Sequence, residues 1–99
     1  MLIDDRFKAN AHDLCKQFGI SRLYVFGSIA RGEETHRSDI DFLAEFDTPS
    51  PATMPERYLG FIEEAQKRFD RPVQLMTPRM IRNPHLKRSI ERDLTVIHE

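Results

Sequence analysis

Asp39 and Asp41 are the two side chains of this chain best suited to bind a hard cation. In a strand, residues two apart point to the same face and lie roughly 6–7 Å apart at Cα, so both carboxylates can converge on a metal. Magnesium prefers oxygen ligands and completes its shell with water and substrate phosphates. The pair therefore predicts half of a site for a metal-bound nucleotide, although the commoner role of this pattern is a solvated polar face.

A glycine and a serine upstream supply a complementary feature. Gly27 and Ser28 follow an apolar run and begin a turn that Gly32 ends. Glycine lets the backbone approach an anion because it has no Cβ, and a serine hydroxyl with free backbone N–H groups can bind a phosphate oxygen. Alone, the two residues are also typical of an ordinary turn. Together with the aspartate pair they predict a phosphate site beside a cation site.

The elements that position these residues follow from hydrophobic spacing and turn signals. The pattern predicts, in chain order, a helix over 7–18, a strand over 23–26, a helical turn over 28–31, a strand over 39–46, a helix over 55–69, a strand over 73–76 and a helix opened by Asn83 and Pro84. Gly19 is expected to end the helix over 7–18. The helix over 55–69 is expected to bury Leu59 among others, and the last helix to bury Leu86, Ile90 and Leu94. The strand over 39–46 is expected to have one apolar and one mostly polar face.

Composition limits the possible classes of protein. A chain of 99 residues buries only about 60–65% of its unfolded surface, which predicts one domain over residues 1–99. A net charge of −1 argues against a general nucleic-acid-binding domain. No apolar run approaches the length of a membrane helix, so no membrane association is expected, and the one cysteine excludes internal disulfides and favours the cytoplasm.

The stretch GSIARGEETHRSDIDFLAEF, from Gly27 to Phe46, has Gly-Ser, ten residues and then Asp39-Ile40-Asp41. It resembles the signature of the DNA-polymerase-β-type nucleotidyltransferase superfamily, and by length the minimal nucleotidyltransferases (MNT). The resemblance implies an α/β (α+β) fold, a small mixed sheet with helices mainly on one face. It also implies that Gly27 and Ser28 hold the phosphates of a nucleoside triphosphate, and that Asp39 and Asp41 are catalytic and bind Mg²⁺. Such enzymes transfer a nucleoside monophosphate and release pyrophosphate.

Two arginines in this stretch are candidates for phosphate contact. Arg31 lies in the turn after Ser28, and Arg37 lies just before the aspartates. A surface arginine near acidic residues is the alternative for both.

Gln74 is the one departure from the family pattern. The family supplies a third carboxylate in a context resembling V-D-L, where this chain has Val73-Gln74-Leu75. Alternation points Gln74 to the side expected for that acid. A glutamine can offer a carbonyl oxygen to a metal but cannot accept a proton. The domain could transfer slowly, bind without turnover, or use Glu45 or Asp70 instead, and the last option is the least favoured.

The resemblance also implies a partner. Minimal nucleotidyltransferases are typically antitoxins encoded beside a HEPN-type ribonuclease toxin, and some neutralise it by transferring AMP from ATP to a toxin tyrosine. This predicts a hetero-oligomer with the toxin. The alternatives are a weakened module that masks the toxin by contact and, less favoured, the catalytic half of a small-molecule enzyme of the aminoglycoside-modifying type. The basic segment from Arg79 to Arg92 is either a solvated helix face or a docking surface.

The remaining residues that could do chemistry give no further site. The four histidines, His12, His36, His85 and His98, have no spacing typical of metal ligands. Cys15 falls on the apolar stripe of the first helix, which predicts a packing role.

Overall fold

Four strands form one mixed sheet in the order β3-β2-β1-β4. In the computed structural model, which describes residues 2–33, 35, 37–48 and 53–99, the elements are, in chain order, α1 (Asp5–Phe18), β1 (Ile20–Phe26), α2 (Ser28–Arg31), β2 (Ile40–Phe46), α3 (Met54–Phe69), β3 (Val73–Met76), a 3₁₀ turn η1 (Pro78–Met80), α4 (Pro84–Asp93) and β4 (Thr95–His98). The proline-containing segment over 47–54 predicts a loop, and its residues 49–52, like His36, lie outside the described residues. The long predicted helices and the three predicted strands are confirmed.

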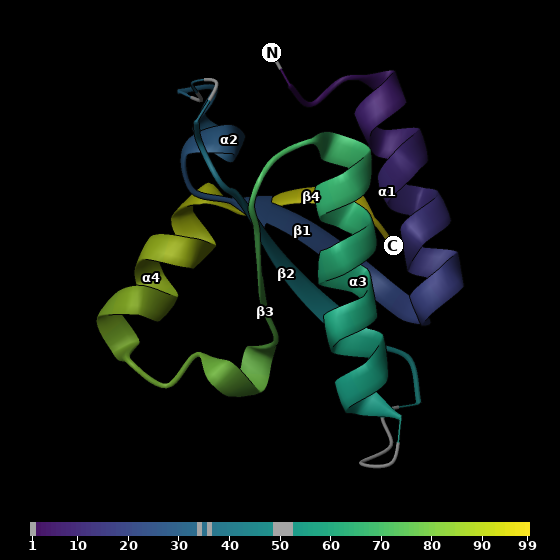
Figure 1. Cartoon of the computed structure of the whole chain (residues 1–99). Coiled ribbons are helices and arrows are strands. Elements are labelled where there is room, and N and C mark those ends of the chain that lie inside the picture. The colour runs from purple at the N-terminus through teal and green to yellow at the C-terminus, as the bar shows by residue number, and fades with distance from the viewer. Residues whose placement is uncertain (1, 34, 36, 49–52) are drawn as a thin grey trace.

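The sheet carries its two longest helices together on one face. β1 pairs antiparallel with β2 and with β4, and β2 pairs parallel with β3. Figure 1 shows α1 and α3 side by side over the sheet, with α4 lying apart from them. The main core lies between this face and the two helices, and Phe42 at its centre is fully buried. The predicted mixed sheet with helices mainly on one face is therefore confirmed.

Local signals explain where α1 begins and ends. The Asp4 side chain accepts a hydrogen bond from the Phe7 backbone N–H at 2.8 Å, which caps the helix. Gly19 then adopts a left-handed conformation (φ 68°) that ends it, as predicted. This end delivers the chain directly into β1, whose last residue leads into the Gly27–Ser28 turn.

The last strand, β4, was not predicted, because the last helix was expected to continue as far as Leu94. Leu94 has φ −57° and ψ 124°, outside the helical region, and the β-branched residues after it favour an extended chain. β4 pairs with β1 and forms one edge of the sheet.

Two predicted side-chain placements were wrong. Leu59 is 60% exposed, and Phe61 is fully buried in its place, because the inner stripe of α3 runs through positions 58, 61, 62, 65 and 69. Leu86 is exposed, so Ile90 is the buried residue of α4. Leu43 lies on the face of β2 opposite Phe42, as alternation predicts, but it is buried and, like Ile90, lies outside the main core. Apolar side chains therefore cover part of the second face of the sheet.

Within the described part of the chain, no helix combines the length and the apolar character needed to cross a membrane.

Candidate functional site

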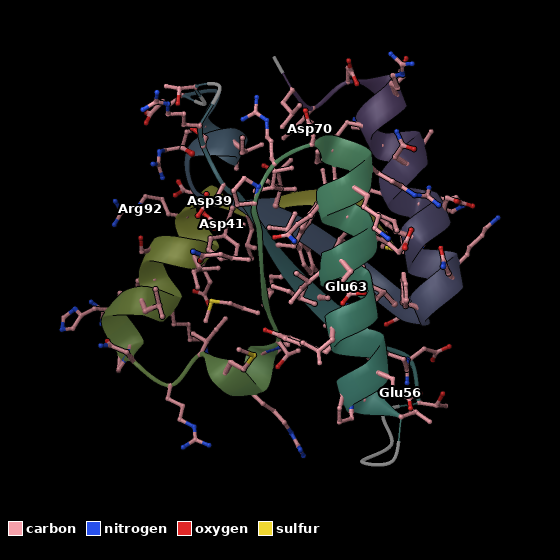
Figure 2. The ribbon with its side chains drawn as sticks, viewed as in Figure 1. Asp39, Asp41, Glu56, Glu63, Asp70 and Arg92 are labelled. Carbon is pink, nitrogen blue, oxygen red and sulfur yellow. The ribbon has the colours of Figure 1, made fainter. Side chains whose placement is uncertain are left out.

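The aspartate pair and the glycine–serine turn lie together at one end of the central strands. Asp41 is the second residue of β2 and pairs with Phe26, the last residue of β1, so Gly27 follows beside it. Asp39 precedes β2, and Figure 2 shows the two aspartates next to each other. The strand pairing thus joins two motifs that are ten residues apart in the sequence.

Gly27 is in contact with Asp41 through its backbone. A Cβ built on Gly27 would lie 2.5 Å from Asp41 Oδ2, closer than real Cβ atoms approach an oxygen. The residue also has φ 77° and ψ −153°, a conformation that essentially only glycine adopts. Any other residue here would push the turn away from the carboxylate. The sequence predicts that Gly27 lets the backbone come close to an anion. In the structure, the anionic group beside Gly27 is the Asp41 carboxylate.

The turn after Gly27 is held by the core. Ile29 of α2 is fully buried, and the Arg31 backbone N–H donates to the Gly27 carbonyl at 3.2 Å. The N-cap position of α2 is Gly27, which has no side chain to cap the helix, and Ser28, its first residue, is partly exposed. Its hydroxyl therefore remains able to bind a phosphate oxygen.

Gln74 lies beside the pair, where alternation placed it. It is the register partner of Asp41 across the parallel β2–β3 ladder, and its amide Nε2 donates to Asp39 Oδ2 at 3.4 Å. Glu45 instead pairs with Arg22, four residues further along β2, and Asp70 ends α3 in a left-handed conformation. Neither alternative acid thus stands in the register position next to Asp41, and Gln74 does.

The electrostatics of the pair favour a cation. Burial, and next the charge of Asp39, raise the pKa of Asp41 above its usual value, while the charge of Arg31 opposes this rise. Two neighbouring carboxylates, one of them partly desolvated, repel each other without a counterion. A divalent cation would relieve that repulsion, and Mg²⁺ commonly binds through one or two carboxylates together with substrate phosphates. The residues present therefore fit a magnesium–nucleotide complex.

Arg31 is held by two acidic side chains. Its Nη1 lies 2.6 Å from Asp93 Oδ2 and its Nε lies 3.1 Å from Glu33 Oε2. Asp93 ends α4, and sequence reasoning did not single it out, because it lies 62 residues from Arg31. Arg37, the second candidate for phosphate contact, is exposed, and its backbone N–H donates to Thr35 Oγ1.

A second pair of titratable groups was also missed. The Nδ1 atoms of His12 on α1 and His98 on β4 are 2.7 Å apart, a hydrogen bond that needs one protonated and one bare nitrogen. Among the described residues, no group of three or more His, Cys, Asp or Glu side chains gathers as a metal site. Burial raises the pKa of the Cys15 thiol to about 12, which suits its predicted packing role.

Comparison with known proteins gives matches over most of the chain. Residues 10–97 match the family described as nucleotidyltransferase domain. A Methanocaldococcus jannaschii protein named as a candidate protein adenylyltransferase is 41% identical over 81 residues, which cover 82% of this chain and 80% of that protein.

Solved structures share the fold. A crystal structure of a toxin–antitoxin complex with AMP-PNP superposes with a TM-score of 0.70 at 18% identity, covering 91% of this chain and 71% of that one. A tri-AMPylated Shewanella oneidensis HEPN toxin in complex with MNT antitoxin gives a TM-score of 0.57 at 17% identity, covering 91% and 67%. At these identities the likeness concerns the fold alone.

Proposed function

Because the chain belongs to the nucleotidyltransferase domain family, we propose that it is an MNT-type antitoxin that transfers AMP from ATP to a HEPN-type toxin and so neutralises it. One observation carries the proposal: the Gly27 backbone lies against the Asp41 carboxylate, so a bound triphosphate and its cations would share one site. The named relative and the toxin–antitoxin complexes support the proposals that the transferred group is AMP and that the acceptor is a protein. Such a protein would act in the cytoplasm, where ATP is abundant.

The proposed chemistry assigns a task to each group. The toxin's hydroxyl oxygen attacks the α-phosphorus of ATP and its proton passes to water. The bond from that phosphorus to the oxygen bridging the α- and β-phosphates breaks, and pyrophosphate leaves. Mg²⁺ bound at Asp39 and Asp41 would supply positive charge for the phosphates as negative charge develops. Gly27 and Ser28 hold and orient the phosphates in line with the acceptor, which is the larger part of catalysis in phosphoryl transfer.

Gln74 favours a second candidate function. Its amide cannot accept the proton that the acceptor hydroxyl loses, so the transfer step would lack a general base at this position. A protein with this site could bind a nucleotide weakly and neutralise the toxin by contact. In this second candidate function the protein has the same fold and the same partner, but it covers the toxin by binding to it and transfers no AMP.

The two candidates are separated by one experiment. The purified protein is incubated with Mg²⁺, ATP and a HEPN-type toxin encoded beside it, and the toxin is examined by mass spectrometry for an adenylyl group. We expect the toxin to carry an adenylyl group after incubation with the wild-type protein, and to carry none after incubation with Asp39→Asn or Asp41→Asn. Asp13→Asn is the matched control, because it removes a carboxylate that pairs with Arg68 away from the site. Neutralisation without any adenylyl group would favour the mask.

A further inference from the structure

We propose that Asp93 is a positioning residue, which fixes the Arg31 guanidinium so that it can contact the phosphates of the bound nucleotide. The inference rests on the proposed function, since Arg31 is a phosphate contact only if the site takes a nucleoside triphosphate. It adds a residue from α4, an element that contributes no other residue to the proposed site.

The hydrogen bonds of Arg31 define how its guanidinium is held. Nη1 donates to Asp93 and Nε donates to Glu33, which fixes two of the three nitrogens of a planar group. Among the described residues, Nη2 has no such partner, so its two N–H groups remain for a ligand. An arginine held at two nitrogens loses less entropy when the third binds phosphate.

Asp93 contributes more to this positioning than Glu33 does. The Asp93 side chain is 12% exposed and that of Glu33 is 64% exposed. Arg31 is exposed, so water screens both ion pairs, and it screens the pair with the less exposed Asp93 carboxylate less. The shorter distance to Asp93, 2.6 Å against 3.1 Å, agrees with this order.

The backbone on both sides of Asp93 is anchored. Ile90, one turn earlier in α4, is 3% exposed, and Thr95, two residues later, is the register partner of Val25 in the β1–β4 ladder. The carboxylate therefore projects from a fixed point of the fold, which a flexible loop would not provide.

Arg31 lies close to the aspartate pair. It is four residues after Gly27, and its backbone N–H donates to the Gly27 carbonyl at 3.2 Å. The charge of Arg31 also acts on Asp41, which agrees with this placement.

The test measures nucleotide binding by calorimetry, with AMP-PNP and Mg²⁺, and with AMP as a second ligand. Asp93→Asn should weaken AMP-PNP binding by up to about fivefold, the effect of losing one partly exposed ion pair. Binding of AMP, which lacks the outer phosphates, should change far less. Asp93→Glu should restore part of the affinity, and Asp13→Asn, which breaks the Arg68 ion pair at 2.8 Å, should leave it unchanged.

A double variant separates positioning from a merely structural role. If Asp93 acts through Arg31, Asp93→Asn should have no further effect on AMP-PNP binding once Arg31→Ala is present. An additive loss in the double variant, an equal loss for AMP, or unchanged AMP-PNP affinity in Asp93→Asn would each overturn the inference. The proposed function fails separately, if the wild-type protein binds no AMP-PNP with Mg²⁺.

Discussion

Gln74 is the residue whose chemistry decides whether this site turns over. It occupies the register position beside Asp41, and it uses its amide to donate a hydrogen bond to Asp39. A carboxylate there could instead bind a cation and accept the acceptor's proton. The side chain thus keeps the shape of the site and removes one charge and one base from it.

Gln74→Asp should therefore raise the rate of AMP transfer, by at least about tenfold, since a placed general base contributes roughly 10²–10⁴-fold. The rate is measured in single-turnover reactions with saturating Mg²⁺ and ATP and a fixed concentration of toxin. Gln74→Asn is the control, because it shortens the side chain and adds no base. An unchanged or lower rate in Gln74→Asp would show that Gln74 does not occupy the place of the missing acid.

At the scale of elements, prediction from the sequence succeeded wherever the signal was local. The helix that ends at Gly19 and the segment from Gly27 to Asp41 are each predicted by the spacing and types of residues that are close together in the sequence. β4 was missed because four β-branched and polar residues after a helix do not form a distinct pattern, and only pairing with β1 makes them a strand. Burial of Phe61 in place of Leu59 depends on how α3 is rotated against the sheet.

The contacts that sequence reasoning could not predict join distant elements. Arg31 and Asp93 are 62 residues apart, and His12 and His98 are 86 residues apart. No spacing rule covers such separations, because they follow from the sheet order β3-β2-β1-β4, which brings the end of the chain back beside α1. Both contacts could be predicted only if the order of the strands in the sheet were already known.

The contact between α1 and β4 predicts a pH dependence of stability. Burial first, and then the charges of His12 and Lys16, lower the pKa of His98 below its usual value. The unfolded chain therefore binds the His98 proton at higher pH than the folded chain does. The contribution that neutral His98 makes to the free energy of unfolding is fully present above about pH 6.5, the unperturbed histidine pKa. It is lost as pH falls through the lower pKa of His98 in the folded state.

Urea unfolding measured between pH 7.5 and 5 should show this loss. His98→Gln should reduce the decline across that window, because the group that takes up the proton is gone. His85→Gln is the control, since His85 is exposed on α4 and its removal should leave the decline intact. An equal decline in wild type and His98→Gln would exclude His98 as its source.

For the whole molecule, β2 joins the core to the site. Its Phe42 ring stacks on Phe7 of α1 and meets the Phe61 ring of α3 edge-to-face, with centroids 6.2 Å and 5.4 Å away. The preceding residue, Asp41, points to the opposite face and faces Gly27. The packing of α1 and α3 on the sheet therefore fixes the strand that carries the aspartates.

Phe42→Ala should then cost about 3–5 kcal/mol of unfolding free energy, from lost burial and the cavity left behind. The total free energy of unfolding of such a domain is only about 5–15 kcal/mol, so this loss should lower the melting temperature clearly. Because the core fixes the strand that carries the aspartates, nucleotide binding should be lost at the same temperature at which the domain unfolds. Leu59→Ala is the control, because Leu59 is 60% exposed and its removal should change stability by less than about 0.5 kcal/mol. Thermal melts followed with and without AMP-PNP and Mg²⁺ measure both effects. If Phe42→Ala lost nucleotide binding while its melting temperature stayed at the wild-type value, the link between core and site would have to run through something other than the stability of β2.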